Sequence, residues 1–285
     1  MEIITQHFRK VVLATLTCVA FAVCIAYFME RNSGLLHVYF LDVGQGDAIY
    51  IRTPNGRDML IDSGPNRAVV QRLSEVMPWY DKSIDVALET HPDADHIGGF
   101  PQILERYKIG VFVEPGVESA NAVDDEIRSL RAEKAVAGEI ARRGIRIDFG
   151  DGAHFDILYP DTDPSKMETN DASIIGRLVY GSTSVMLTGD APKSVENRLH
   201  MLDGERLAST ILKAGHHGSK GSSGESFVRA VGPLFGVISA GRKNRYGHPH
   251  KEVMDILAAG RVEVSRTDME GTIGFVSDGK AFFKE

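Results

Sequence analysis

The sequence predicts an α/β fold of the α+β kind, with two β-sheets packed face to face and helices on both outer surfaces. The expected order of elements, strands first and then alternating strands and helices twice over, indicates these four αββα layers. With 285 residues and 43% apolar content, the chain can bury a full core. One domain or two small ones fit this length. We expect one domain over residues 34–285.

Residues 1–33 are expected to form a separate apolar helix that acts as a membrane anchor or a signal segment. Val11 to Met29 is about twenty residues without a charge, which is enough to cross a bilayer. Because two basic residues precede it, the positive-inside rule places the remainder of the chain outside the cytoplasm. The alternative is export after cleavage near Ala20-Phe21-Ala22, which resembles a small-residue cleavage site.

The first half of the domain reads mainly as strands separated by glycine-containing turns. Strands are expected at 35–53 (two strands around a glycine turn), 58–64, 83–90 and 109–115, with helices at 68–75 and 99–107. The Pro-Asn-Gly sequence at 54–56 favours a hairpin turn between the second and third strands.

The second half begins with a charged amphipathic segment from Asp124 to Arg143, which Gly144 stops. Strands are expected at 145–150, 153–160, 173–181, 183–190, 208–215 and 233–241, helices at 192–199, 227–232 and 251–260, and a closing hairpin at 271–285. No internal repeat or low-complexity segment interrupts this order.

Charge and cysteine content narrow the possible chemistry. The net charge of −7 gives no sign of a strongly basic, nucleic-acid-binding surface, but two divalent cations would reduce it to about −3. The two cysteines, Cys18 and Cys24, both lie in the N-terminal apolar stretch. The domain therefore has neither a disulfide framework nor a thiolate nucleophile.

The segment His91-Pro-Asp-Ala-Asp-His-Ile-Gly-Gly99 carries the clearest chemical signal. It follows an apolar strand, and loops at strand ends are common sites of function. Imidazole and carboxylate together suit divalent transition metals. Four such ligands are too many for one open site, so we expect two ions, one on His91 and Asp93 and the other on Asp95 and His96.

This segment resembles the metal-binding motif of the metallo-β-lactamase fold superfamily, in its His-x-Asp-x-Asp-His-x-Gly-Gly variant. Five further motifs occur in the matching order, namely Phe40–Ala48, Leu60–Gly64, Leu187–Asp190, Leu212–Ser219 and Asn244–His250. Together they resemble the hydrolase domain of ComEC-type competence proteins over residues 35–285. In that family the domain accompanies a channel and an oligonucleotide-binding fold, so we expect this chain to represent the catalytic part.

The resemblance implies roles for residues outside the nonapeptide. Asp190 would bridge both ions, and His216 would complete the second one. His217 is the alternative ligand, or an acid on the substrate side. Asp62 would orient the ligand loop by hydrogen bonds, and Asn170 stands where the superfamily commonly has a third histidine.

Two divalent ions, manganese or zinc, are the expected cofactors. The first site would hold His91, Asp93 and Asp190, with Asn170 nearby, and such oxygen-rich ligation raises the case for manganese. Two ions about 3.5–4 Å apart lower the pKa of a bridging water, which then acts as the nucleophile, and clamp both oxygens of an in-line displacement.

Substrate contacts are expected from two further regions. Lys213 could neutralise a phosphate. The loop at 242–251 is basic and could hold a phosphate backbone or stack a base, with His248 as an acid or phosphate contact. The catalytic candidates are Asp95, Asp190, Lys213, His217 and His248, and the substrate-binding candidates are Arg242, Asn244, Arg245, Tyr246 and His250.

These features predict a binuclear metallohydrolase, specifically a phosphodiesterase or nuclease acting on single-stranded DNA, with a link to DNA uptake. One alternative is hydrolysis of another phosphoester, such as phosphorylcholine on a cell-wall polymer. The other is a non-catalytic binding module that kept the fold. The intact set of candidate ligands favours an enzyme, because a decayed enzyme need not retain them.

Overall fold

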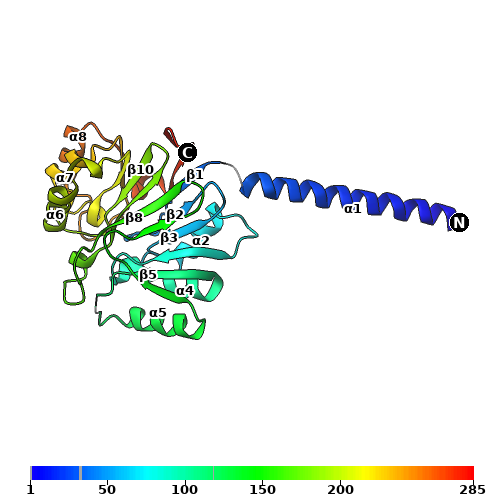
Figure 1. The fold of residues 1–285 in the computed structure, drawn as a ribbon, viewed down its shortest axis with the longest axis horizontal. Coiled ribbons are helices and arrows are strands. Elements are labelled where there is room, and N and C mark those ends of the chain that lie inside the picture. Colours follow the sequence, from blue (N-terminus) through cyan, green and yellow to red (C-terminus); the bar gives the residue numbers. More distant parts are fainter. Residues whose placement is uncertain (1, 32–33, 118) are drawn as a thin grey trace.

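The computed structural model describes residues 2–31, 34–117 and 119–285, and over these residues the chain forms two β-sheets that face each other (Figure 1). The first has eight strands in the order β15 (Phe282–Lys284), β14 (Ile273–Ser277), β1 (Leu36–Phe40), β2 (Ile49–Arg52), β3 (Asp58–Ile61), β4 (Ser83–Leu88), β5 (Lys108–Glu114) and β6 (Ala137–Ile140). The second has seven in the order β13 (Glu263–Arg266), β12 (Phe235–Ile238), β11 (Ile211–Lys213), β10 (Thr183–Leu187), β9 (Ile175–Tyr180), β8 (Ala153–Tyr159) and β7 (Arg146–Asp148).

Parallel pairing aligns the strand ends that matter for function. Strands β3 to β6 are parallel neighbours in the first sheet, and β10 to β13 are parallel neighbours in the second. The carboxyl ends of parallel neighbours lie at the same edge of a sheet, where α/β proteins place their ligands. At the other end of the first sheet, β1 pairs antiparallel with both β2 and β14.

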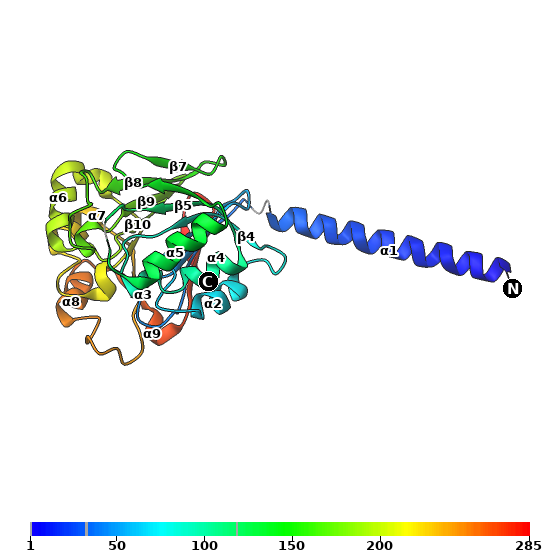
Figure 2. The ribbon, with the colours of Figure 1, turned by 90° about the horizontal axis from the view of Figure 1, so that it is seen from below.

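Helices cover the outer face of each sheet and complete four layers (Figure 2). Over the first sheet lie α2 (Ala68–Val76), α4 (Phe100–Arg106) and α5 (Ala122–Glu133), and over the second lie α6 (Lys193–Asp203), α7 (Glu225–Val231) and α8 (Lys251–Ala259). The short elements are α3 (Ala94–Ile97), η1 (Asn170–Ala172), η2 (Gly204–Leu207), η3 (Gly215–Gly218) and α9 (Thr267–Glu270).

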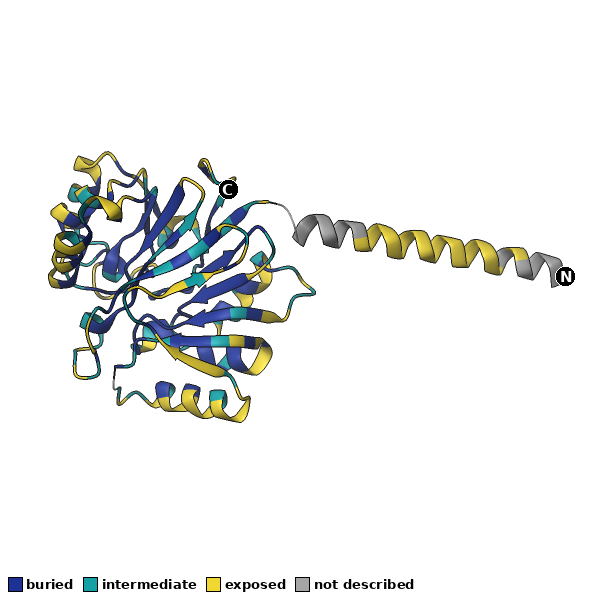
Figure 3. Ribbon diagram, in the orientation of Figure 1, coloured by how far each residue is buried: buried dark blue, intermediate teal, exposed yellow. Residues whose placement is uncertain are grey.

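Three apolar clusters hold the layers together (Figure 3). One lies between the sheets and includes Phe155 and Phe275. The second joins the first sheet to its helices through residues such as Phe100, and the third joins the second sheet to its helices through residues such as Phe227. Removing such apolar area from water is the main favourable term in folding. The predicted fold with two facing sheets is confirmed.

The prediction for the N-terminal segment needs correction. Helix α1 (Glu2–Arg31) precedes the sheets and lies outside the two-sheet body (Figure 1). Among the described residues, no helix combines the length and the apolar content that a membrane span requires. The predicted membrane anchor at residues 1–33 is therefore wrong, and the predicted localisation outside the cytoplasm, which depended on it, is withdrawn.

The charged segment from Asp124 to Arg143 also differs from the prediction. Helix α5 ends at Glu133, and the chain then forms β6 at the edge of the first sheet. All four residues of β6 are exposed, so this strand lacks the alternation of apolar and polar residues that would reveal it. The charged residues of the segment 124–143 made the predicted helix too long.

Candidate metal centre

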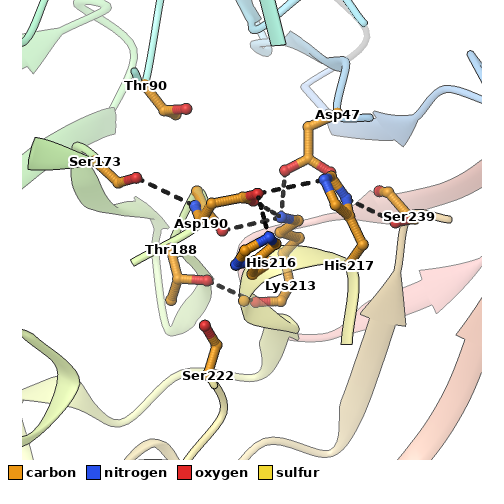
Figure 4. Close-up of polar contacts among 12 residues, drawn as sticks. Asp47, Thr90, Ser173, Thr188, Asp190, Lys213, His216, His217, Ser222 and Ser239 are labelled. Atoms are coloured by element: carbon orange, nitrogen blue, oxygen red, sulfur yellow. Dashed lines mark hydrogen bonds and ion pairs between the residues drawn. The ribbon is translucent and has the colours of Figure 1, made fainter. Parts of the chain in front are cut away.

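Loops from both sheets meet at one edge of the molecule and bring polar side chains together (Figure 4). The loop between β1 and β2 supplies Asp47, and the loop after β4 supplies His91 and His96. From the second sheet, Asp190 follows β10 and His217 follows β11. These five side chains are almost completely buried, although all of them are ionisable. Burying such groups is costly unless they are paired or bind metal, so their arrangement indicates a site.

The nonapeptide places two imidazoles against the carboxylate of Asp190. His96 Nε2 lies 3.3 Å from Asp190 Oδ1, and the His91 and His96 rings are 4.1 Å apart between centroids. Ligand atoms of these three residues all lie within 4.8 Å of one another. The Nε2 atoms of both histidines and Oδ1 of Asp190 are buried without a hydrogen-bond partner among the described residues. Unpartnered imidazole and carboxylate atoms at this spacing fit a divalent transition metal.

A second group contains Asp95, His96 and His217, with ligand atoms again within 4.8 Å. His217 Nε2 lies 3.3 Å from Asp95 Oδ2 and 3.4 Å from Asp190 Oδ2. Because both groups contact Asp190, two ions placed there would share this carboxylate. The arrangement fits the bridging role that the resemblance implies for Asp190.

The two adjacent histidines after β11 lie differently. His216 Nε2 is 3.6 Å from Asp190 Oδ2, but its side chain is 34% exposed and it belongs to none of the ligand groups found in the described residues. His217 is buried, and its ring lies near Ser239 O, with Nδ1 at 3.0 Å. The geometry thus favours His217 as the ligand, whereas the sequence analysis preferred His216.

Both histidines have left-handed backbone conformations, with φ of 49° and 55°. A residue with a side chain adopts this region rarely, and the strain costs about 1–3 kcal/mol. In this left-handed turn the two adjacent side chains lie apart, His217 buried at the centre and His216 partly exposed. Such strain is common where a chain must aim a side chain at a functional site.

Asp93 and Asn170 fit the first site less closely than the sequence predicts. Asp93 Oδ2 lies 3.7 Å from His91 Nε2, and its side chain is 40% exposed. Asn170 Oδ1 is buried without a hydrogen-bond partner in the described part of the chain. Among the described residues, Asp93 belongs to none of the groups of histidine and carboxylate ligands.

Asp62 holds the ligand loop from beneath. Its carboxylate accepts hydrogen bonds from the backbone N and the hydroxyl of Thr90, both at 2.8 Å. It also lies 2.7 Å from His96 Nδ1, which leaves Nε2 of that ring to face Asp190. This arrangement fits the positioning role predicted for Asp62, because the second nitrogen of a metal-binding histidine usually bonds a carboxylate.

Asp47 and Lys213 form an ion pair beneath the centre, which sequence reasoning missed. The side chains of both residues are only 1% exposed, and Lys213 Nζ also donates to Gly189 O at 3.1 Å. The ammonium group is 3.7 Å from Asp190 Oδ1. So deep a lysine does not fit the predicted contact with a substrate phosphate. It instead supports Asp190 from behind.

The loop that contains Asp47 is pressed against the ligand loop. Gly46 has a φ of 136°, and a Cβ atom there would lie 2.1 Å from the backbone oxygen of Asp95. Only glycine allows this approach. The Gly-Gln-Gly turn, whose role the sequence alone left open, is therefore a support for Asp95.

Buried opposite charges control the protonation of the centre. Burial alone would lower the pKa of His217, but the carboxylates of Asp190 and Asp47 raise it well above its usual value. Burial alone would also lower the pKa of His96, but the carboxylates of Asp190 and Asp62 raise it well above its usual value. Burial lowers the pKa of His91 to about 3. Protons and metal ions therefore compete for His96 and His217.

The loop between β12 and α8 forms one wall of a hollow of about 570 Å³ beside Asp95. Arg245 and Tyr246 line this hollow, and the Tyr246 side chain is 49% exposed. Asn244 also lines it, but its amide bonds the backbone of Gly241 and His248. Asn244 therefore shapes the loop, whereas Arg245 and Tyr246, which bond each other through Arg245 Nη2 and Tyr246 OH at 2.8 Å, are exposed.

The remaining candidates in this region differ in position. Burial, followed by the charges of His217 and His216, lowers the pKa of His248 to about 4. A residue that is neutral near pH 7 does not fit a general acid, which leaves a hydrogen bond to phosphate. His250 Nδ1 lies 3.2 Å from the Lys220 amide, and Arg242 is exposed at the edge of the loop.

Comparisons with known proteins agree with this geometry. The family model described as "Metallo-beta-lactamase superfamily" matches residues 41–242. The chain is 33% identical over 260 residues to "ComE operon protein 3" of Bacillus subtilis, covering 84% of this chain and 32% of that protein. It is 29% identical over 238 residues to "Competence protein ComA" of Neisseria gonorrhoeae, covering 82% and 31%. The chain spans about a third of the length of these curated relatives.

Solved structures share the fold at low sequence identity. The metallo-β-lactamase fold protein YhfI of Bacillus subtilis has a TM-score of 0.56 at 12% identity, covering 85% of this chain and 99% of that one. CmlA of Streptomyces venezuelae, a diiron β-hydroxylase, has a TM-score of 0.54 at 14% identity, covering 88% and 54%. The resemblance to the superfamily and to competence proteins is therefore confirmed.

Proposed function

The chain belongs to the metallo-β-lactamase superfamily, and we propose that it is a binuclear metal-dependent phosphodiesterase that hydrolyses single-stranded DNA. The observation that carries this proposal is the set of buried ligand atoms around Asp190. Nε2 of His91, His96 and His217 and one oxygen of Asp190 have no hydrogen-bond partner among the described residues. Leaving such atoms unpaired costs free energy that bound cations would offset.

The residues divide into two overlapping sets. His91, His96 and Asp190 would hold one ion, and Asp95 and His217 would hold the other together with Asp190. Asp93 and Asn170 remain candidates for additional oxygen ligands. When bound, the two cations supply Lewis acidity toward phosphate oxygens and lower the pKa of water.

The protein's own groups would orient the phosphodiester. The carboxylate of Asp95 lines the hollow at its metal end, so the scissile phosphate would lie beside it. Arg245 is exposed on the same wall and would pair with a phosphate oxygen. Neutral His248 would donate or accept a hydrogen bond, and Asp62 and Lys213 would keep the ligands in place without touching substrate.

Two observations support DNA as the substrate. The relatives named as competence proteins suggest a link to DNA uptake. In addition, Tyr246 is exposed and lines the hollow, where its ring stacks on His248 at an interplanar angle of 21° and lies against the Arg245 guanidinium. An aromatic ring in that position can stack an unpaired base.

Hydrolysis assays on the purified chain test the proposal. With manganese or zinc added, we expect cleavage of single-stranded DNA and slower cleavage of duplex DNA, and no cleavage by Asp190→Asn or after chelation. Cleavage of a small generic diester without cleavage of DNA would favour another phosphoester. Metal binding without cleavage of any ester would favour a binding module.

The metal itself is proposed to be manganese or zinc. Elemental analysis of protein purified without added metal distinguishes them, and we expect two ions per chain. A tightly held pair of zinc ions would reject the preference for manganese. Fewer than one ion per chain after equilibration with either metal would contradict the two-ion centre.

A further inference from the structure

A groove leads away from the candidate metal centre along the helices that cover the first sheet. The hollow beside Asp95 ends at Pro65 and Asn66. The same two residues begin a larger groove of about 1300 Å³ that continues between α2 and α4. Its other lining residues are Arg67, Ala68, Val70, Gln71, Ser74, Lys82, Gly98, Gln102, Arg106 and Tyr107. The two hollows therefore adjoin at Pro65 and Asn66, between the metal centre and the outer helix layer.

The lining of this α2–α4 groove is basic, although the chain as a whole carries a net charge of −7. Arg67, Lys82 and Arg106 are exposed, and no carboxylate is present among the lining residues. Within the described part of the chain, none of the three cations forms a salt bridge. The groove thus holds three cations that are free to meet a ligand.

Nearby acidic side chains do not neutralise these cations. Glu75 pairs with Arg72, with Oε2 at 3.1 Å from Nη1. Asp81, directly before Lys82 in the sequence, lies 3.5 Å from Arg52 Nη1. Both carboxylates are therefore engaged by other arginines. Glu105, directly before Arg106, is also exposed, but it is not among the residues that line the groove.

We propose that the α2–α4 groove binds the sugar-phosphate backbone of a single-stranded polynucleotide whose scissile phosphate lies at the metal centre. This inference rests on the proposed function. A small phosphoester would fill only the hollow beside Asp95, and the cations of the groove would have no partner. A strand entering past Tyr246 would instead stack one base there and place successive phosphates near Arg67, Arg106 and Lys82. The amide of Gln102 supplies a further donor for phosphate or sugar oxygens.

Binding of fluorescently labelled single-stranded DNA tests the groove without relying on catalysis. The variant Arg67→Gln/Lys82→Gln/Arg106→Gln removes the three charges. Its control, Arg206→Gln/Arg229→Gln/Arg261→Gln, removes three exposed charges from the opposite side of the molecule. We expect the groove variant to bind a strand of about 20 nucleotides at least tenfold more weakly than the control variant does. The slope of log K against log salt should fall by about 2, as expected for three lost contacts on a single strand.

Steady-state kinetics separates the groove from the chemistry. We expect the groove variant to show a KM for the long strand raised about tenfold, with unchanged kcat and unchanged hydrolysis of a small diester. If the two triple variants bind DNA equally and have equal KM, the proposal that the groove binds the strand is overturned, even if the chain cleaves DNA. Loss of binding in the groove variant alone would support the groove, even if the wild type cleaves nothing. Tighter binding of duplex than of single strands would overturn the choice of a single strand.

Discussion

The two ends of strand β3 place buried aspartates in opposite situations. At its start, Asp58 and Asp85 exchange hydrogen bonds between side chain and backbone, both at 3.0 Å, and Tyr50 donates its hydroxyl to Asp58 at 3.1 Å. At its end, Asp62 binds Thr90 and His96, and His96 in turn presents an unpartnered Nε2 to Asp190. At the Asp58 end, both carboxylate oxygens have hydrogen-bond partners. At the Asp62 end, the contacts lead to ligand atoms that have none among the described residues.

The difference shows what separates a structural cluster from a binding site. Both ends bury ionisable residues, so burial and charge alone do not identify function. At the Asp58 end, each carboxylate oxygen of Asp58 has a partner. At the metal end, the groups nearest the protein interior are satisfied, and the atoms that face one another across the centre are not. Four substitutions test this distinction, from the largest expected effect to the smallest, and His216→Ala serves as the comparison for the third.

Replacement of the shared carboxylate should have the largest effect. In Asp190→Asn, a neutral amide stands where two ions would meet, and we expect hydrolysis to fall about a thousandfold, because Lewis-acid stabilisation is worth several kcal/mol. Elemental analysis after dialysis should show loss of at least one ion. Full activity with full metal content in this variant would contradict the proposed centre.

The cluster of Asp58, Asp85 and Tyr50 should make the free energy of unfolding depend on pH. Burial raises the pKa of Asp58 to about 7, despite hydrogen bonds that oppose the shift. Stability from the neutral form is therefore fully present below pH 4 and is lost as the pH rises through 7. Asp58→Asn stays neutral and keeps compatible hydrogen bonds, so its free energy of unfolding relative to the wild type should rise by about 3 kcal/mol between pH 4 and pH 8.

Denaturant titrations of both proteins, in the presence of a chelator, measure this difference. Metal-dependent hydrolysis by Asp58→Asn should equal that of the wild type, because the cluster has no open ligand atom. A stability difference that does not change with pH would show that Asp58 is not held neutral by burial.

The adjacent histidines offer the next test. We expect His217→Ala to weaken metal binding by about a hundredfold. Loss of a residue that only supports a metal ligand already lowers the affinity by up to about a hundredfold. His216→Ala should weaken it less than tenfold, because its imidazole is partly exposed and lies outside the ligand groups. Competition against a chromophoric chelator measures both affinities, and the reverse order would restore His216 as the ligand.

Apart from the comparison variant His216→Ala, Asp62→Asn should have the smallest effect. The amide can still accept a hydrogen bond from Thr90, but its NH₂ group would face His96 Nδ1 and disturb the orientation of that ring. We expect metal affinity to fall about tenfold to thirtyfold. Asp58→Asn is the matched control on the same strand, and equal affinities in the two variants would remove the distinction between the two ends.

The ligand loop and the fold could be predicted from sequence because their signals are local. His91, Asp95 and His96 stand in a short spacing that few other structures require, and the order of strands and helices indicates two facing sheets. Asp62 and Asp190 each follow an apolar strand directly. Such patterns depend only on neighbours along the chain, so they can be recognised without knowledge of the tertiary structure.

The remaining features depend on contacts between distant segments. Lys213 looks like a solvated residue at a strand end until Asp47, from the other sheet, is placed against it. The choice between His216 and His217 depends on two left-handed backbone conformations that no residue type in Gly-His-His-Gly demands. The exposed strand β6 carries no apolar alternation, so its pairing with β5 is visible only in the structure.

The pairing of β1 with β14 also constrains how the chain can be made. Leu36 and Ser277 are partners in one ladder, so this edge of β1 cannot be paired until residues 273–277 have been synthesised. Until then, one edge of β1 has free backbone groups, which invite pairing with other chains. Contacts this distant also slow folding. Folding of the first sheet should therefore be sensitive to early termination of translation before residue 273.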